Sequence, residues 1–109
     1  MSGDLSVTTY FSELSALATR LGSAGISIYH AEYHMRAFGS WVLEAERGHR
    51  CAKAVWDGKD GCLSVSVGTR PDSRAQIAWQ HLPEQRIASG GYKEIFAAAE
   101  RVFVERVGT

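Results

Sequence analysis

Short stretches of alternating apolar and polar residues fill the middle of the chain, and they constrain its fold more than any other feature. In the first stretch, residues 29–37, apolar or small side chains occupy every second position. A period of two is typical of a strand with one buried face. Three further apolar-rich stretches follow, each after a glycine-containing loop: 41–47, 50–56 and 62–67. Short strands in succession predict an antiparallel meander.

A helical period replaces this alternation near both ends of the chain. Apolar side chains recur at steps of three and four over residues 9–21, and again over residues 92–107 ahead of Gly108. Each pattern predicts an amphipathic helix with one apolar stripe. We therefore expect an α+β fold in which an antiparallel sheet of four or five strands carries both helices on one face.

The whole chain, residues 1–109, has the length of one domain. Residues 1–8 are expected to form a flexible start. A fifth strand is predicted at 76–82, where Pro83 would end it.

The register of the sheet follows from keeping charges out of the core, because a shift by one residue would exchange the two faces. Loops at Phe38–Ser40, Gly48–His49 and Gly58–Gly61 meet this condition. The predicted core face is Tyr33, Met35, Trp41, Leu43, Ala45, Ala52, Ala54, Trp56, Leu63, Val65 and Val67. The predicted outer face is Glu32, His34, Arg36, Val42, Glu44, Glu46, Cys51, Lys53, Val55, Ser64 and Ser66.

Charge and hydropathy disfavour two classes of partner. The 12 Lys and Arg residues balance the 12 Asp and Glu residues, so the chain lacks the positive charge typical of nucleic-acid binding. No apolar run approaches the roughly 18 residues of a membrane span, and Met1–Asp4 lacks the basic start of a secretory signal. We expect a cytoplasmic protein. Cys51 and Cys62 should be free thiols, since the predicted register separates them by roughly 15–20 Å.

The segment His30–His34 contains metal-ligating residue types at a spacing that does not suit one ion. Strand residues four apart are separated by about 13 Å, whereas a metal bond to histidine is about 2 Å long. No motif for another cofactor is present in the sequence, so no cofactor is predicted.

The predicted register creates a different cluster across strands. It places Glu32 opposite Glu46, and His34 opposite Glu44, which in turn faces Lys53. Directly opposed carboxylates repel each other unless a cation, a raised pKa, a basic partner or water relieves them. A cation or a raised pKa would suit acid–base or metal-assisted chemistry, and water alone would leave an ordinary solvated surface.

Two functions are compatible with these patterns. The first is a protein-binding module, of the accessory, inhibitor or immunity-like kind, that holds a partner or a second copy of itself. It would use an apolar centre on the outer face with a polar rim: Arg36, Val42, Glu44, Lys53 and Val55. The alternative is a small metal-dependent or acid–base enzyme, with its site on the same face: Glu32, His34, Glu44 and Glu46. The sequence does not decide whether the protein is an enzyme, but the lack of a catalytic, metal or nucleotide motif favours a protein that is not one.

Overall fold

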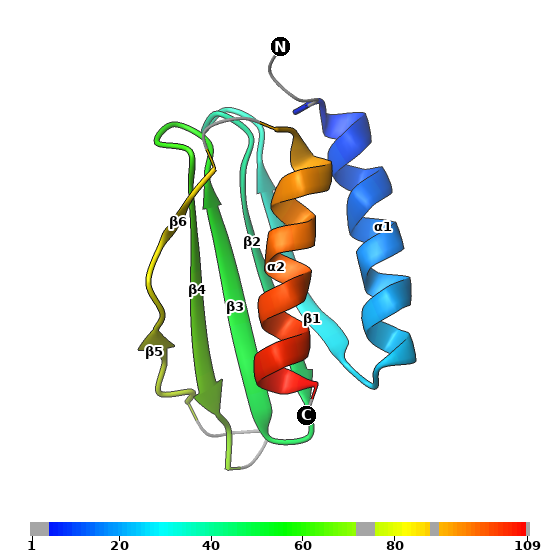
Figure 1. Ribbon diagram of the computed structural model, residues 1–109, viewed down its shortest axis with the longest axis vertical. Coiled ribbons are helices and arrows are strands. Elements are labelled where there is room, and N and C mark those ends of the chain that lie inside the picture. Colours follow the sequence, from blue (N-terminus) through cyan, green and yellow to red (C-terminus); the bar gives the residue numbers. More distant parts are fainter. Residues whose placement is uncertain (1–4, 72–75, 88–89, 109) are drawn as a thin grey trace.

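Two helices lie on one face of an antiparallel sheet in the computed structural model, which describes residues 5–71, 76–87 and 90–108 (Figure 1). The strands are arranged in the order β1-β2-β3-β4-β5, and β6 also pairs with β4. The elements are α1 (Val7–Ser23), β1 (Ser27–His34), β2 (Ser40–Arg47), β3 (Arg50–Asp57), β4 (Cys62–Thr69), β5 (Gln80–His81), β6 (Gln85–Arg86) and α2 (Tyr92–Val107). The predicted α+β meander with a helix near each end is confirmed.

Helix α1 begins two residues before the predicted start. The side chain of Ser6 accepts a hydrogen bond from the backbone N–H of Thr9 at 3.2 Å, which satisfies one of the free donors at the helix start. Part of the expected flexible start is therefore helical, since α1 already includes Val7 and Thr8. Residues 1–4 of that start lie outside the described residues.

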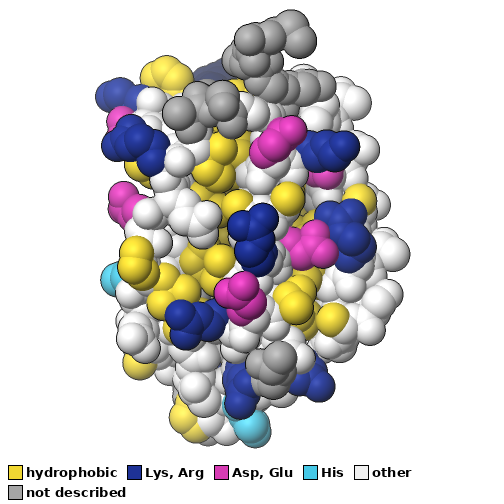
Figure 2. Space-filling model, in the orientation of Figure 1, with side chains coloured by type: hydrophobic (Ala, Val, Ile, Leu, Met, Phe, Trp, Pro, Cys, Tyr) yellow, Lys and Arg dark blue, Asp and Glu magenta, His cyan; other side chains and the backbone are white. Residues whose placement is uncertain are grey.

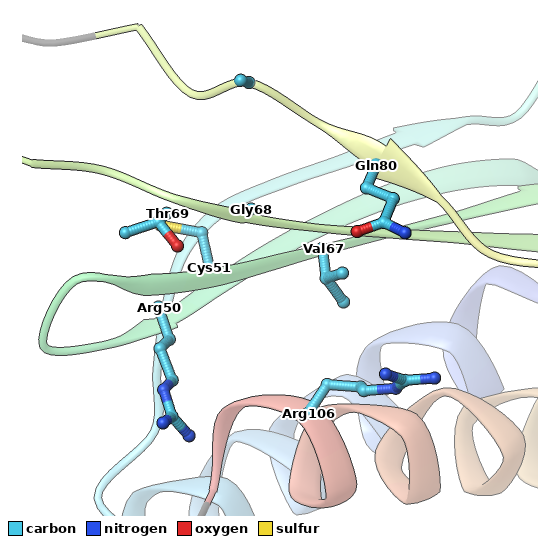
Figure 3. A pocket seen from close by; sticks show the side chains of 8 residues that line it. Arg50, Cys51, Val67, Gly68, Thr69, Gln80 and Arg106 are labelled. Carbon is cyan, nitrogen blue, oxygen red and sulfur yellow. The ribbon is translucent and has the colours of Figure 1, made fainter.

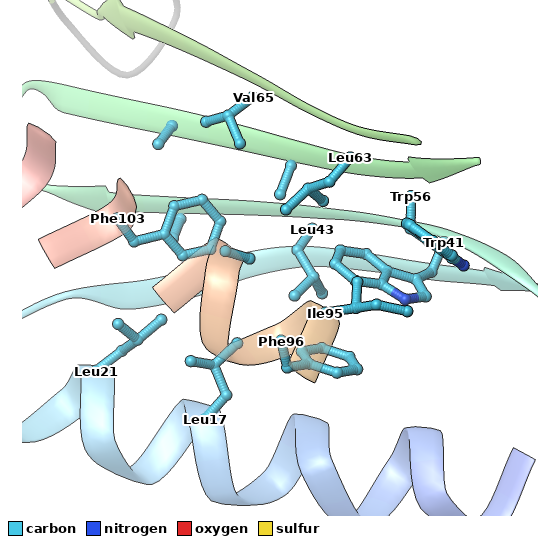
Figure 4. Packing of buried hydrophobic residues seen from close by; sticks show 14 of the residues in the cluster. Leu17, Leu21, Trp41, Leu43, Trp56, Leu63, Val65, Ile95, Phe96 and Phe103 are labelled. Atoms are coloured by element: carbon cyan, nitrogen blue, oxygen red, sulfur yellow. The ribbon is translucent and has the colours of Figure 1, made fainter. Parts of the chain in front are cut away.

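The core lies between the two helices and the sheet (Figure 4). Trp41 of β2 stacks on Phe96 of α2, with ring centroids 4.6 Å apart. The small side chains of Ala45, Ala52 and Ala54 are fully buried beneath the helices, where their size lets a helix approach the sheet closely. In the described part of the chain, neither helix is both long and apolar enough to cross a membrane.

The register of β2, β3 and β4 is the predicted one. Val42 pairs with Val55, and Glu44 pairs with Lys53. Asp57 pairs with Cys62 at the next hairpin. Both cysteines are free and buried.

The predicted pairing of β1 with β2 is wrong by four residues. Tyr33 pairs with Trp41, because the turn spans residues 35–39 rather than Phe38–Ser40. Met35 therefore leaves the predicted core face and is 67% exposed. Arg36 leaves the predicted outer face and lies in the same turn.

Local backbone geometry accounts for this turn. Phe38 and Gly39 both have left-handed backbone angles, with φ of 58° and 69°, and they reverse the chain before Ser40. A shift of four residues keeps the alternation of faces, so Tyr33 still packs against the core.

A β-bulge interrupts β1 near its start. Ile28 pairs with Ala45 and His30 pairs with Glu44, which leaves Tyr29 without a strand partner. The extra residue lets Ile28 pack against the core, whereas Tyr29 reaches the outer side and contacts Glu44.

The predicted fifth strand is much shorter than expected. Only Gln80 and His81 pair with β4, and pairing resumes after Pro83 at Gln85 and Arg86. Proline lacks a backbone N–H and so cannot continue a ladder of hydrogen bonds. The result is a broken edge beside β4.

Candidate binding face of the sheet

The outer face is the side of the sheet turned away from α1 and α2. Val42 and Val55 are direct neighbours on β2 and β3 at its centre, and both are half-buried. Glu32 of β1 and Ser64 of β4 extend this row on either side. The predicted valine pair and the neighbouring Glu44–Lys53 pair are therefore on this face, whereas Arg36 of the predicted rim lies in the β1–β2 turn.

One carboxylate lies between two imidazoles beside this spot. Glu32 is 3.2 Å from Nε2 of His30 and 3.3 Å from Nε2 of His34. Nε2 of His30 also lies 4.0 Å from a carboxylate oxygen of Glu44. The approach of His30 to Glu44 is possible because the bulge at Tyr29 places the two residues side by side on the outer face.

The predicted pairing of Glu32 with Glu46 is wrong, since Glu32 pairs with Val42. Glu46 is four residues further along β2, or about 13 Å away. Its carboxylate forms an ion pair with Arg70 at 3.5 Å. The predicted pairing of His34 with Glu44 is also wrong, because His34 pairs with Ser40. The structure therefore separates Glu46 from Glu32 and His34, whereas Glu44 lies two residues from it on the same face of β2.

Glu44 is held by groups from two directions. The hydroxyl of Tyr29 donates a hydrogen bond to Glu44 Oε1 at 3.2 Å, and His30 approaches the other oxygen. Burial, and then the charge of Glu44, raise the pKa of the Tyr29 phenol. The guanidinium of Arg70 lies 5.0 Å above the Tyr29 ring.

The chain before β5 covers one corner of the outer face. The ammonium of Lys53 lies 4.7 Å from the ring centroid of Trp79, and the Ser66 hydroxyl is 2.6 Å from Nδ1 of His81. Ser66 is consequently only 3% exposed. The rest of the face, around Val42 and Val55, is not crossed by any described helix or strand.

Gly68 of β4 allows the chain before β5 to pass close to the strand. A Cβ at this position would lie 2.6 Å from a methyl carbon of Ile77 and 2.9 Å from the carbonyl oxygen of Ala78. Glycine inside a strand often indicates such a close approach of another segment. That signal was present in the sequence, whereas the irregular pattern around Trp79 carried none.

The cluster of His30, Glu32 and His34 on this face is open to solvent. The side chains of His30, Glu32 and His34 are 39%, 49% and 51% exposed, and they lie on an open strand surface. In residues 5–71, 76–87 and 90–108, no three His, Cys, Asp or Glu side chains are arranged to hold a metal ion. On the helix side, by comparison, basic and acidic side chains are interspersed with apolar ones (Figure 2).

Comparison of the chain with family models, curated proteins and solved structures gave no match. The function is therefore argued from the outer face itself.

Proposed function

We propose that this protein is a protein-binding module that docks a partner on the outer face around Val42 and Val55. The observation that carries the proposal is the pair itself: two half-buried valines, directly opposed at the centre of a sheet face that no described helix covers. An apolar centre inside a polar rim is the usual organisation of a protein interface.

The charges of the rim favour a partner with basic residues. Among the described residues, the ion pairs of Glu32 and Glu44 are made to histidines rather than to lysine or arginine. A Lys or Arg side chain of the partner could approach these carboxylates while an apolar group covers the valines. Such charge complementarity raises association rates and selects among partners.

An acid–base enzyme is less well supported by the same residues. The contacts of Glu32 with His30 and His34 bring titratable groups together. However, these groups lie on an exposed surface, whereas enzyme sites are usually concave and exclude water. The geometry therefore favours a binding role.

Site-specific photo-crosslinking tests the proposal. A photoreactive residue at Val55 should capture a protein partner, and Glu44→Arg should abolish that capture by reversing a charge on the rim. A photoreactive residue at Arg101, an exposed position of α2, provides the matched control on the other side of the molecule.

Captured protein that is lost with Glu44→Arg and absent from the Arg101 control supports the proposal. Equal capture at Val55 and Arg101 contradicts it. Capture of a second copy of this chain, with a dimer in sedimentation, contradicts the choice of a basic partner.

A further inference from the structure

A pocket of about 470 Å³ lies between the end of β4, the chain that leads into β5, and the last turn of α2 (Figure 3). Pockets for small molecules usually have volumes of roughly 300–1,000 Å³. The lining residues are Arg50, Cys51, Val67, Gly68, Thr69, Ala78, Gln80 and Arg106. This region is separate from the valine pair of the proposed protein-binding site.

Specific contacts fix the walls of this pocket. Ala78 can approach β4 because Gly68 has no side chain. The β2–β3 turn is attached to the end of β4 by two hydrogen bonds: Arg70 N–H donates to the His49 carbonyl at 2.8 Å, and His49 Nδ1 lies 2.9 Å from the Arg70 carbonyl. The pocket is therefore part of the folded structure.

Four arginines lie at this end of the sheet, and they differ in what they contact. Arg47 donates to the carbonyl of Gly108 at the end of α2, and Arg70 pairs with Glu46. Arg50 and Arg106 line the pocket. Within the described part of the chain, neither of these two makes an ion pair or a side-chain hydrogen bond.

We propose that the pocket binds a small organic anion whose carboxylate or phosphate group brings together the exposed guanidinium groups of Arg50 and Arg106, which point away from each other in Figure 3. A guanidinium donates parallel hydrogen bonds to an oxyanion, and such charged hydrogen bonds are stronger than neutral ones. Val67 lies on the same side of the strands as both arginines (Figure 3). Together with Ala78, it offers an apolar surface to the body of the ligand.

Polar groups at the rim add selectivity. The hydroxyl of Thr69 and the amide of Gln80 also line the pocket, and both can donate hydrogen bonds to an oxyanion. The combination of two cations, two neutral donors and an apolar wall fits a molecule with one charged end and one apolar end.

An NMR titration with three probes tests this proposal: inorganic phosphate, benzoate and phenyl phosphate. Saturable shifts are expected at the backbone amides of Gly68, Thr69 and Gln80. The organic anions should bind more tightly than inorganic phosphate, and the tighter of the two identifies the preferred head group. Binding should weaken as the salt concentration rises.

Charge-removing variants locate the site. Arg50→Gln and Arg106→Gln should each raise the dissociation constant at least about tenfold, since each removes a charged hydrogen bond. Arg101→Gln, at an exposed position of the same helix that does not line the pocket, should leave it unchanged.

Two outcomes would overturn the proposal: no saturable shift up to about 10 mM of any probe, or unchanged affinity in both arginine variants. Inorganic phosphate binding as tightly as phenyl phosphate would contradict the role given to Val67 and Ala78.

Discussion

The hydroxyl of Tyr92 donates a hydrogen bond to the carbonyl oxygen of Gly39 across 2.6 Å, and so connects the first residue of α2 to the β1–β2 turn. Tyr92 is fully buried. A side chain at position 39 would collide with this hydroxyl, and the left-handed φ of Gly39 also favours glycine. Because this turn sets how β1 pairs with β2, the hydrogen bond couples the register of β1 to the packing of α2.

Removing this hydroxyl should destabilise the fold. In Tyr92→Phe, the Gly39 carbonyl loses its donor, which should lower the free energy of unfolding by about 1–3 kcal/mol. Urea denaturation followed by circular dichroism measures this change. Tyr29→Phe is the control, because Tyr29 is partly exposed and its bond to Glu44 lies on the surface. Equal stability of Tyr92→Phe and the wild type would contradict the prediction.

The same residue should make stability depend on alkaline pH. Burial, and then the neighbouring hydroxyl of Tyr33, raise the pKa of Tyr92, whereas an unfolded tyrosine titrates near about pH 10. Stability from this group is fully present below about pH 10 and decreases as the pH rises towards the folded-state pKa, because the unfolded chain releases its proton first. The stability difference between the wild type and Tyr92→Phe should therefore narrow above about pH 10. A constant difference up to about pH 11 would argue against it.

The cap of α1 can be tested with a pair of serines. Ser6→Ala removes the acceptor for the Thr9 N–H and should cost about 1 kcal/mol of unfolding free energy. Ser12→Ala changes an exposed serine inside the helix and should be neutral or slightly stabilising, because alanine has the higher helix propensity. Thermal unfolding compares the two variants, and a similar effect of both would exclude Ser6 as the cap.

Gly68→Ala should displace the chain before β5. The new Cβ would lie too close to Ile77 and to a backbone oxygen of Ala78, so we expect a loss of about 1–3 kcal/mol. The indole NMR signal of Trp79 should shift as its contact with Lys53 changes. Gly22→Ala is the matched control, since a Cβ there meets nothing within 4 Å. It should stabilise α1, and an unshifted Trp79 signal in Gly68→Ala would contradict the predicted displacement.

Glu94 should contribute to stability at neutral pH. Its Oε2 accepts a hydrogen bond from the Gly91 N–H at 2.8 Å at the start of α2, and this bond lowers the pKa of Glu94 below its ordinary value. The contribution is present above the unfolded-state pKa and is lost as the pH falls through the lower folded-state pKa. Glu94→Gln should be less stable at pH 7, and its deficit should disappear in acid. Denaturation at several pH values measures this, and a deficit that does not change with pH would refute it.

The register of β2, β3 and β4 could be predicted because their loops are short and any odd shift would bury Glu44 or Lys53. The same reasoning could not fix β1. A shift of four residues preserves both faces, and the choice depends on contacts between distant parts of the chain, such as that of Tyr92 with Gly39. Alternation alone contains no information about these contacts.

The sequence predicted only the part of the candidate face that depends on the pairing of β2 with β3. Val42, Val55 and the Glu44–Lys53 pair follow from the correct register. The role of His30 depends on the bulge at Tyr29, and that of Trp79 depends on an irregular segment that crosses Gly68. Neither has a period that a sequence pattern could detect.

The two edges of the sheet differ in length and continuity, and this limits how strands of other chains can pair with it. The eight-residue strand β1 forms one edge of the sheet, whereas the other edge consists of two dipeptides, β5 and β6, separated by residues 82–84. An added strand needs an unbroken row of backbone donors and acceptors, and among the described edge strands the longest such row is the part of β1 after its bulge, His30–His34. Two chains joined there would leave only broken edges outward, so growth would end at a pair and could not continue into a fibre.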